Sequence, residues 1–288
     1  MLRNLRKRKE LTKIISEIVK TYGKDEDWMQ HFWETPLPRE DAIIDVVQKL
    51  RNVLFPGYFI KEYGRKDNIE SYASELVHDV HERLTGEIYK VLHQNCQHGV
   101  VSGREDGDCE GCQENSAEVS LNFASTISGL RQLLSLDLEA AIAGDPAAKS
   151  YNEIILSYPG IFAVTVYRIA HELVRLKVPL IPRMMTEYAH RETGIDIHPG
   201  ARIGRSFFID HGTGVVIGET SVVEDNVSIF QGVTLGGTGK EDGDRHPKVR
   251  EGVLLSASST VLGNVEIGKN AKVAAGSVVL KDVREHST

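Results

Sequence analysis

An aliphatic residue recurs every six positions between residues 197 and 279, and this period constrains the fold more than any other feature. It fits neither a lone α-helix nor a simple β-hairpin sheet, whereas hexapeptide repeats are typical of a parallel β-helix. Each hexapeptide forms one side of a triangular coil, and its aliphatic residue stacks on the equivalent residue of the next coil. The repeat runs in three registers: Ile197, Ile203 and Ile209; Ile217, Val223, Ile229 and Leu235; and Val249, Leu255, Val261, Ile267, Val273 and Val279.

Before residue 193 the apolar residues are spaced by three and four, which predicts amphipathic helices. The expected faces are Ile43, Val46, Val47, Leu50 and Leu54; Leu76, Val80, Leu84, Ile88 and Val91; Leu130, Leu133, Leu134 and Leu138; and the stretch 161–176. Asp145-Pro146 is typical of a helix start, with Asp as the N-cap. We therefore predict an α+β chain in which an N-terminal all-helical domain, residues 1–192, precedes a β-helix domain, residues 193–288.

The bulk composition excludes several classes of protein. The 288-residue chain has a formal net charge of −7, which is not the basic character of a nucleic-acid-binding protein. No apolar stretch approaches the roughly 20 residues needed to span a bilayer, and no apolar segment follows the basic N-terminus. Three clustered cysteines are a poor disulfide framework. We therefore expect a cytoplasmic protein with no nucleic-acid or membrane partner.

The period slips at two places, and each slip contains a histidine. Ile209 and Ile217 are eight positions apart, with His211 between them. The next slip, which contains His246, predicts a loop over residues 236–248 that protrudes from the coil. Interruptions of a regular solenoid repeat are expected mainly at functional sites, so we expect the functional site at these two slips.

Several segments closely resemble bacterial and plant serine acetyltransferases. They are Asp196-Ile197-His198-Pro199, Asp210-His211-Gly212-Thr213-Gly214, Val216-Ile217-Gly218-Glu219-Thr220, the glycine-rich run 232–240 and Asp244-Arg245-His246-Pro247-Lys248, with Asp145-Pro146-Ala147 and Tyr167-Arg168-Ile169-Ala170-His171 upstream. The resemblance covers residues 140–283 and implies a left-handed parallel β-helix. It also implies a serine O-acetyltransferase, which moves an acetyl group from acetyl-CoA to the hydroxyl of L-serine, the first step of cysteine biosynthesis from serine.

Acylation of a serine hydroxyl needs a base, because an alcohol is a poor nucleophile at neutral pH. A histidine with a pKa near ~6.5 can take the proton, and works best when a carboxylate orients its ring. We assign His211 as the general base and Asp196, one coil earlier, as its orienting partner, the roles that the resemblance implies. No Cys or Ser is placed as an acyl-enzyme nucleophile, so we expect direct transfer without a catalytic metal.

The resemblance also implies a site for the zwitterion L-serine. Arg245 can grip the substrate carboxylate through two hydrogen bonds, and His246 can assist it. Asp145 and Asp210 can bind the ammonium and hydroxyl groups.

The pantetheine arm of acetyl-CoA can lie along an edge of a β-helix where the side chains are small. Ala257 and Ala275 are one coil apart and should stack on one line, and Gly237 lies in the glycine-rich run. The resemblance assigns all three to the co-substrate.

The assembly and partners are likewise expectations from the resemblance. The β-helices should form a homotrimer with active sites between adjacent subunits, and the helical halves should join two trimers into a hexamer. L-Cysteine, a serine mimic, should inhibit at the pocket of Arg245 and His246. Many members carry a tail that docks into O-acetylserine sulfhydrylase; the sequence stops at Thr288 without that tail and so gives this partnership no support.

Residues 93–118 form a polar, Cys- and His-containing insertion that departs from the resemblance. His93-x2-Cys96 and Cys109-x2-Cys112 are separated by twelve residues, close to the spacing of a zinc knuckle. The sequence is compatible with a structural zinc at these four residues or with a disordered insertion that contains incidental thiols.

Three alternatives to a serine acetyltransferase stay open at this point. A sugar acetyltransferase would share the β-helix but would lack the long helical half. A γ-type carbonic anhydrase binds zinc between subunits through three histidines, here His198, His211 and His246. A non-enzymatic β-helix scaffold would have no need of slips that carry histidines.

Overall fold

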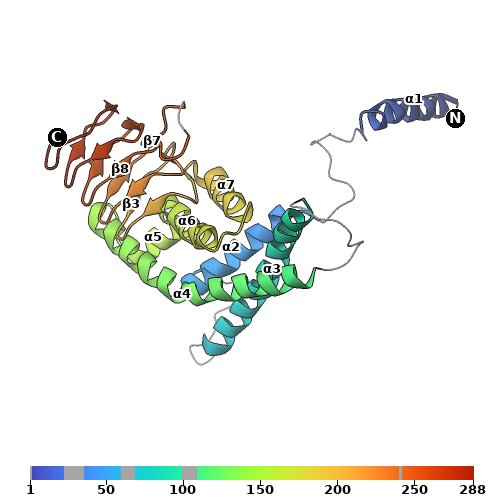
Figure 1. The fold of residues 1–288 in the computed structure, drawn as a ribbon, viewed down its shortest axis with the longest axis horizontal. Coiled ribbons are helices and arrows are strands. Elements are labelled where there is room, and N and C mark those ends of the chain that lie inside the picture. Colours follow the sequence, from blue (N-terminus) through green and yellow to red (C-terminus); the bar gives the residue numbers. More distant parts are fainter. Residues whose placement is uncertain (1, 23–35, 60–68, 99–108, 240–241) are drawn as a thin grey trace. The chain divides into compact units, whose positions relative to one another are not determined.

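The structure, a computed structural model, describes residues 2–22, 36–59, 69–98, 109–239 and 242–288. The chain divides into two compact units, residues 1–36 and residues 37–288. In the first unit, α1 (Leu2–Val19) leaves the apolar side chains of Leu11, Ile14 and Ile18 exposed. The second unit contains the remaining helices and the β-helix (Figure 1).

Helices form the first part of the second unit, as the three- and four-residue spacing predicts. The apolar residues predicted for the first face, Ile43 to Leu54, are all buried on one side of its helix. Val80, Leu84, Ile88 and Val91 are buried on the second, which confirms the periodicity. The helices are α2 (Glu40–Leu54), α3 (Ile69–His98), α4 (Glu110–Gly144), α5 (Tyr151–Ser157), α6 (Pro159–Arg175) and α7 (Ile181–Thr193).

The predicted insertion over residues 93–118 is not a loop in its described parts. Residues 93–98 form the end of α3, and residues 110–118 form the start of α4. Residues 99–108 lie outside the described residues. Ser116 and Ser120 are buried although polar, and Ser120 Oγ donates a hydrogen bond to the carbonyl of His81 on α3. The described ends of this insertion are therefore helical and belong to α3 and α4, which pack against each other.

The prediction of a helix start at Asp145-Pro146 is wrong. Asp145 instead follows the last residue of α4, and its backbone N–H donates to the Ala141 carbonyl. Its Oδ1 accepts the N–H of Ala147 at 2.8 Å, a local turn that short Asp side chains favour. The next helix begins at Tyr151, six residues later, and Ser150 Oγ accepts the N–H of Glu153 as its N-cap.

The second part is a left-handed parallel β-helix with three faces. Face 1 orders its strands β1-β4-β7-β10-β13, face 2 orders them β2-β5-β8-β11, and face 3 orders them β3-β6-β9-β12. The strands are β1 (Asp196–Ile197), β2 (Arg202–Ile203), β3 (Phe208–Asp210), β4 (Val216–Ile217), β5 (Val222–Val223), β6 (Ser228–Phe230), β7 (Thr234–Gly236), β8 (Lys248–Val249), β9 (Leu254–Leu255), β10 (Thr260–Leu262), β11 (Glu266–Ile267), β12 (Lys272–Val273) and β13 (Val278–Val279).

The six-residue period is confirmed residue by residue, because the predicted aliphatic residues pair with one another between coils. Ile197, Ile217, Leu235, Val261 and Val279 are aligned on face 1. The sets on the other faces are Ile203, Val223, Val249 and Ile267, and Ile209, Ile229, Leu255 and Val273. Both slips also fall between strands as predicted, after β3 and after β7.

A buried ion pair joins the helices to the first coil. Arg168 on α6 donates two hydrogen bonds to Asp137 on α4, at 2.6 and 2.8 Å, and both side chains are almost completely buried. Arg168 also donates to the carbonyl of Gly204, and Asp137 accepts the N–H of Phe207. Burial raises the pKa of Asp137 while the guanidinium opposes that shift. The pair thus satisfies backbone groups of the coil that would otherwise be buried without partners.

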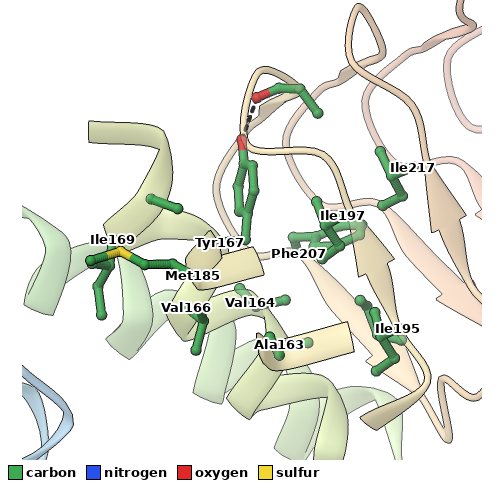
Figure 2. Packing of buried hydrophobic residues seen from close by; sticks show 14 of the residues in the cluster. Ala163, Val164, Val166, Tyr167, Ile169, Met185, Ile195, Ile197, Phe207 and Ile217 are labelled. Atoms are coloured by element: carbon green, nitrogen blue, oxygen red, sulfur yellow. Dashed lines mark hydrogen bonds between the residues drawn. The ribbon is translucent and has the colours of Figure 1, made fainter. Parts of the chain in front are cut away.

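The helical part and the β-helix share one hydrophobic core. Figure 2 shows Ala163 and Val164 of α6 beside Ile195 and Ile197, with the hydroxyl of Tyr167 bonded to a coil carbonyl. That hydroxyl donates to the carbonyl of Ala201 at 2.6 Å. Helix α7 ends at Thr193 and β1 begins at Asp196, and the helical part from residue 37 and the β-helix pack as one compact unit.

No single helix among the described residues is long and apolar enough to cross a membrane. Taken together, α5 and α6 pass that test of length and composition, but they bend by 72° at their junction. Much of α6 is buried in the core described above.

We expect Asp137→Asn to lower the free energy of unfolding by about 3–5 kcal/mol, because it leaves the Arg168 guanidinium buried without a counter-charge. Glu40→Gln is the matched control: it breaks the exposed ion pair with Arg191 and should cost less than about 1 kcal/mol. Urea denaturation followed by circular dichroism measures both. Equal losses would contradict a special role for the buried pair.

Candidate functional site

Two corners of the triangular coil contain the predicted site residues. The His211 corner, where face 3 turns into face 1, comprises residues 211–215, 231–233, 256–259 and 274–277. The Arg245 corner, where face 1 turns into face 2, comprises residues 198–201, 218–221, 237–239 and 242–247. Backbone hydrogen bonds stack the turns of the His211 corner: Gly214 to Gly194, Gly232 to Thr213, Ser258 to Gln231 and Gly276 to Ala257.

The first slip opens the His211 corner into a wide turn. His211 has a φ of +56°, and Gly212 and Gly214 have φ values of +95° and +81°. Left-handed backbone is unusual for a histidine and indicates a local constraint. The side chain of His211 is 74% exposed, and its Nε2 lies 4.0 Å from Oδ2 of the half-buried Asp210. An exposed imidazole beside a carboxylate is thereby presented at the edge of the coil.

The helices place two more polar groups beside this turn. The hydroxyl of Tyr158, between α5 and α6, donates a hydrogen bond to Oδ2 of Asp145. That bond raises the pKa of Tyr158 to about 12 and lowers the pKa of Asp145. The charges of His211 and Asp210 contribute to these two shifts, so all four residues share one electrostatic environment. We call Asp145, Tyr158, Asp210 and His211 the acceptor cluster.

Tyr158 was missed by reasoning from the sequence, whose only signal was its position before Pro159 at a helix start. The helix approaches the coil closely there because residue 160 is a glycine. A Cβ on Gly160 would lie 2.5 Å from the carbonyl oxygen of Ile209, directly before Asp210. The short distance between helix and strand is what brings Tyr158 to the acceptor cluster.

His246 at the Arg245 corner is held in one orientation. It is 7% exposed, and its Nδ1 accepts the backbone N–H of Thr220 at 3.2 Å and lies 2.8 Å from the Thr220 hydroxyl. This network assigns the proton of the neutral ring to Nε2. The His246 ring fits here only because residue 218 is a glycine, since a Cβ at that position would lie 2.0 Å from His246 Cδ2.

Burial shifts the histidines of this corner toward the neutral form. Burial, with the charge of Arg245 next, lowers the pKa of His246. Burial, with the charge of Arg183 next, lowers the pKa of His198. Arg245 itself pairs with Glu219 at 3.1 Å, and both side chains are partly exposed. The corner therefore combines a positive guanidinium with neutral imidazoles.

The predicted partnership of Asp196 with His211 stays a prediction. Asp196 lies on β1, and its ion pair is with Arg183 of α7 at 3.7 Å. Within the described parts of the chain, no hydrogen bond or ion pair joins Asp196 to His211.

Within a single chain, the residues predicted to bind acetyl-CoA lie at two different corners of the coil. Ala257 and Ala275 lie on one line at the His211 corner, as predicted, above the turn that contains His211. Gly237 lies at the Arg245 corner instead, where a Cβ on it would meet the Arg245 side chain. Strand β4 separates the two corners, and no hydrogen bond or ion pair between described residues links the acceptor cluster to Arg245 or His246.

The cysteines lie at the opposite end of α4 from Asp145. At 1.5 Å per residue, that helix of 35 residues separates them by about 50 Å. Hydrogen bonds from the backbone of Cys112 lower the pKa of Cys109, and burial raises the pKa of Cys112 to about 12. This cluster is too distant to take part in chemistry at His211.

Comparison with known proteins identifies the architecture. Residues 246–281 match the model of the bacterial transferase hexapeptide (six repeats). The chain is 51% identical over 157 residues to a serine acetyltransferase of Bacillus pumilus, which covers 54% of this chain and 72% of the relative. The chain belongs to the serine acetyltransferase family.

Solved serine acetyltransferase structures extend the likeness to the helical part. Isoform 3 from Entamoeba histolytica, in complex with cysteine, has a TM-score of 0.72 at 30% identity and covers 94% of this chain and 88% of its own. The enzyme from Brucella abortus, in complex with coenzyme A, has a TM-score of 0.56 at 32% identity and covers 84% and 90%. These serine acetyltransferases support the left-handed β-helix assigned above.

We expect stability to fall as the pH drops from about 6.5 toward 5, because the lowered pKa values of His198 and His246 let the unfolded chain bind more protons in that window. Above that window the stability contributed by the neutral rings is fully present. His246→Asn should flatten this slope, and His78→Asn, at an exposed position on α3, should not. Denaturation at matched pH values measures both slopes; an unchanged slope in His246→Asn would refute the assignment.

Proposed function

We propose that this chain is a serine O-acetyltransferase that converts acetyl-CoA and L-serine into O-acetyl-L-serine and CoA, the first step of cysteine biosynthesis from serine. The observation that carries the proposal is the exposed imidazole of His211, held on a left-handed turn beside Asp145 and Asp210. The family supports serine as the acceptor, over the sugar acetyltransferase, carbonic anhydrase and scaffold alternatives.

His211 acts as the general base in this proposal. Its imidazole takes the proton from the serine hydroxyl while the oxygen attacks the thioester carbonyl. The tetrahedral intermediate then collapses with cleavage of the C–S bond, and the imidazolium returns the proton to the departing CoA sulfur. Asp196, by resemblance, would orient the ring and stabilise its charged form. No acyl-enzyme is required, because both substrates meet directly at the corner.

The serine zwitterion is bound from both ends. Asp145 and Asp210 supply negative charge for the ammonium group beside His211. Arg245 and His246 supply the carboxylate site. The ion pair between Arg245 and Glu219 is partly exposed and worth no more than about 1 kcal/mol, so a substrate carboxylate can replace Glu219 easily. L-Cysteine has the same two charged ends and would compete there as an inhibitor.

Acetyl-CoA is the co-substrate, and its pantetheine arm lies along the His211 corner. Ala257 and Ala275 follow His211 two and three coils higher. At about 4.8 Å per coil these two small side chains lie roughly 10 and 14 Å above His211, with Gln231 of the intervening coil between them and the base. The coenzyme A complex of the Brucella abortus relative supports this co-substrate.

The complete site forms between two copies of the chain. Because the acceptor cluster and Arg245 occupy different corners, one subunit's His211 corner must face the Arg245 corner and Gly237 of a neighbour. Such a heterologous contact closes into a ring, here a homotrimer of β-helices. Pairing of two trimers through the helical parts gives the hexamer expected from the resemblance.

A cytoplasmic location is part of the same proposal. Its support is the cysteine content: three clustered cysteines are a poor disulfide framework, as is usual in a reducing compartment.

We expect His211→Asn to lower kcat by about 10²- to 10⁴-fold with a smaller change in the KM for serine, because the variant loses its base but keeps the serine site. His286→Asn is the matched control, since His286 is also exposed and has a φ of +56°. Release of CoA from acetyl-CoA in the presence of L-serine measures both. Wild-type protein with no serine-dependent release would overturn the proposed function.

Co-expression of His211→Asn with Arg245→Gln chains should restore activity that each variant lacks alone. In randomly mixed rings about a quarter of the interfaces join an intact His211 corner to an intact Arg245 corner. The control mixture, His211→Asn with Asp210→Asn, places both changes on one corner and should stay inactive. Mixed assemblies no more active than the separate variants would show that the site lies within one chain.

A further inference from the structure

Three potential metal ligands meet where α3 ends and α4 begins, and the exposed Cys96 lies beside them as a fourth. One ligand atom from each of His93, Cys109 and Cys112 lies within 4.8 Å of the other two. Cys96 is three residues after His93 on the same face of α3, and its thiol is close enough to hydrogen-bond with both other cysteines. The two helices thus contribute two ligands each.

The α4 end of this cluster has the form of a metal-binding knuckle. Cys109 is the N-cap of α4: its carbonyl accepts the backbone N–H groups of Cys112 and Gln113, and the nearby backbone of Cys112 lowers the pKa of its thiol. This first turn places the Cys109 and Cys112 side chains, three residues apart, on one side of the start of α4. Cys112 is 8% exposed, so its sulfur faces the cluster rather than solvent.

The α3 end supplies an oriented imidazole. The ring of His93 stacks on Tyr89 one turn earlier, with 5.2 Å between ring centroids and 10° between the planes. The stacking fixes the ring while its nitrogen faces the thiols. A disulfide between two cysteines would involve neither a third thiol nor an oriented histidine, whereas a tetrahedral metal ion binds all four side chains.

We propose that His93, Cys96, Cys109 and Cys112 bind one structural Zn²⁺ that fastens the end of α3 to the start of α4. Zinc prefers four sulfur and nitrogen ligands, with Zn–S near 2.3 Å and neighbouring sulfurs therefore about 3.8 Å apart. Ligand atoms already within 4.8 Å reach that geometry through small side-chain movements. The set of four leaves no open coordination position, so the ion serves the fold and not catalysis.

The proposed ion ties the two long helices together where α3 ends and α4 begins. α3 and α4 pack along each other, and α4 continues to the β-helix, where it carries Asp137 and ends at Asp145. Metal affinity becomes folding stability when the unfolded chain has no preformed site. This inference does not depend on the proposed acetyl transfer.

Zinc content of the full-length protein, purified without chelators and after removal of any affinity tag, tests the proposal. We expect about one zinc per chain by mass spectrometry of the metal. Replacement of zinc by Co²⁺ should produce the thiolate charge-transfer and visible bands of a tetrahedral site. Zinc removal should speed hydrogen exchange in residues 90–96 and 110–116 without a matching change near residue 211.

Variants separate ligation from general damage to the fold. Cys109→Ser combined with Cys112→Ser should hold less than roughly a tenth of the zinc, and His93→Cys should retain it as a four-cysteine site. His78→Asn, also on α3, is the control that should keep the full content. Wild-type protein without stoichiometric zinc, whether its thiols are free or form a disulfide, overturns the proposal. So does zinc that persists in the double cysteine variant.

Discussion

The buried pair of Arg168 and Asp137 is the contact on which the candidate site depends. It links α4 and α6 to the first coil, and it satisfies the backbone of Gly204 and Phe207 directly before β3. That strand leads into Asp210 and the turn that contains His211. Because an unpaired charge in this position is costly, the pair admits few arrangements of helix against coil. A surface contact could not fix the acceptor cluster so firmly.

The regular repeats of the β-helix form its core, and the two interruptions of the repeat contain the candidate site residues. The stacked aliphatic residues make a rigid prism, and the chemistry is confined to two interruptions of that prism. At one, left-handed backbone presents His211 to solvent; at the other, Thr220 and Gly218 hold a buried His246. Their separation on different corners explains why a trimeric arrangement is proposed for a site that a single chain leaves in two halves. The proposed zinc, about 50 Å away along α4, concerns stability alone.

Reasoning from the sequence was most successful where structure is set by local repetition. A period of six requires only that each residue find its counterpart one coil away, so all thirteen predicted aliphatic positions are aligned in the coil. The buried face of α2 follows from helical spacing in the same way. The error at Asp145 has the opposite origin: the dipeptide Asp-Pro suits several turns, and the packing of α4 and α5 selected one that does not begin a helix.

The sequence by itself determined the coil, its register, the positions of its two slips and the residue types available there. The tertiary structure alone decided that Tyr158 joins Asp145 beside His211, that Gly237 lies at another corner from Ala257 and Ala275, and that His93 faces Cys109 and Cys112 across two helices. Each of these depends on contacts between segments far apart in the chain, which no local period encodes. Packing between helices and coil, governed by close approaches such as Gly160 on Ile209, set them.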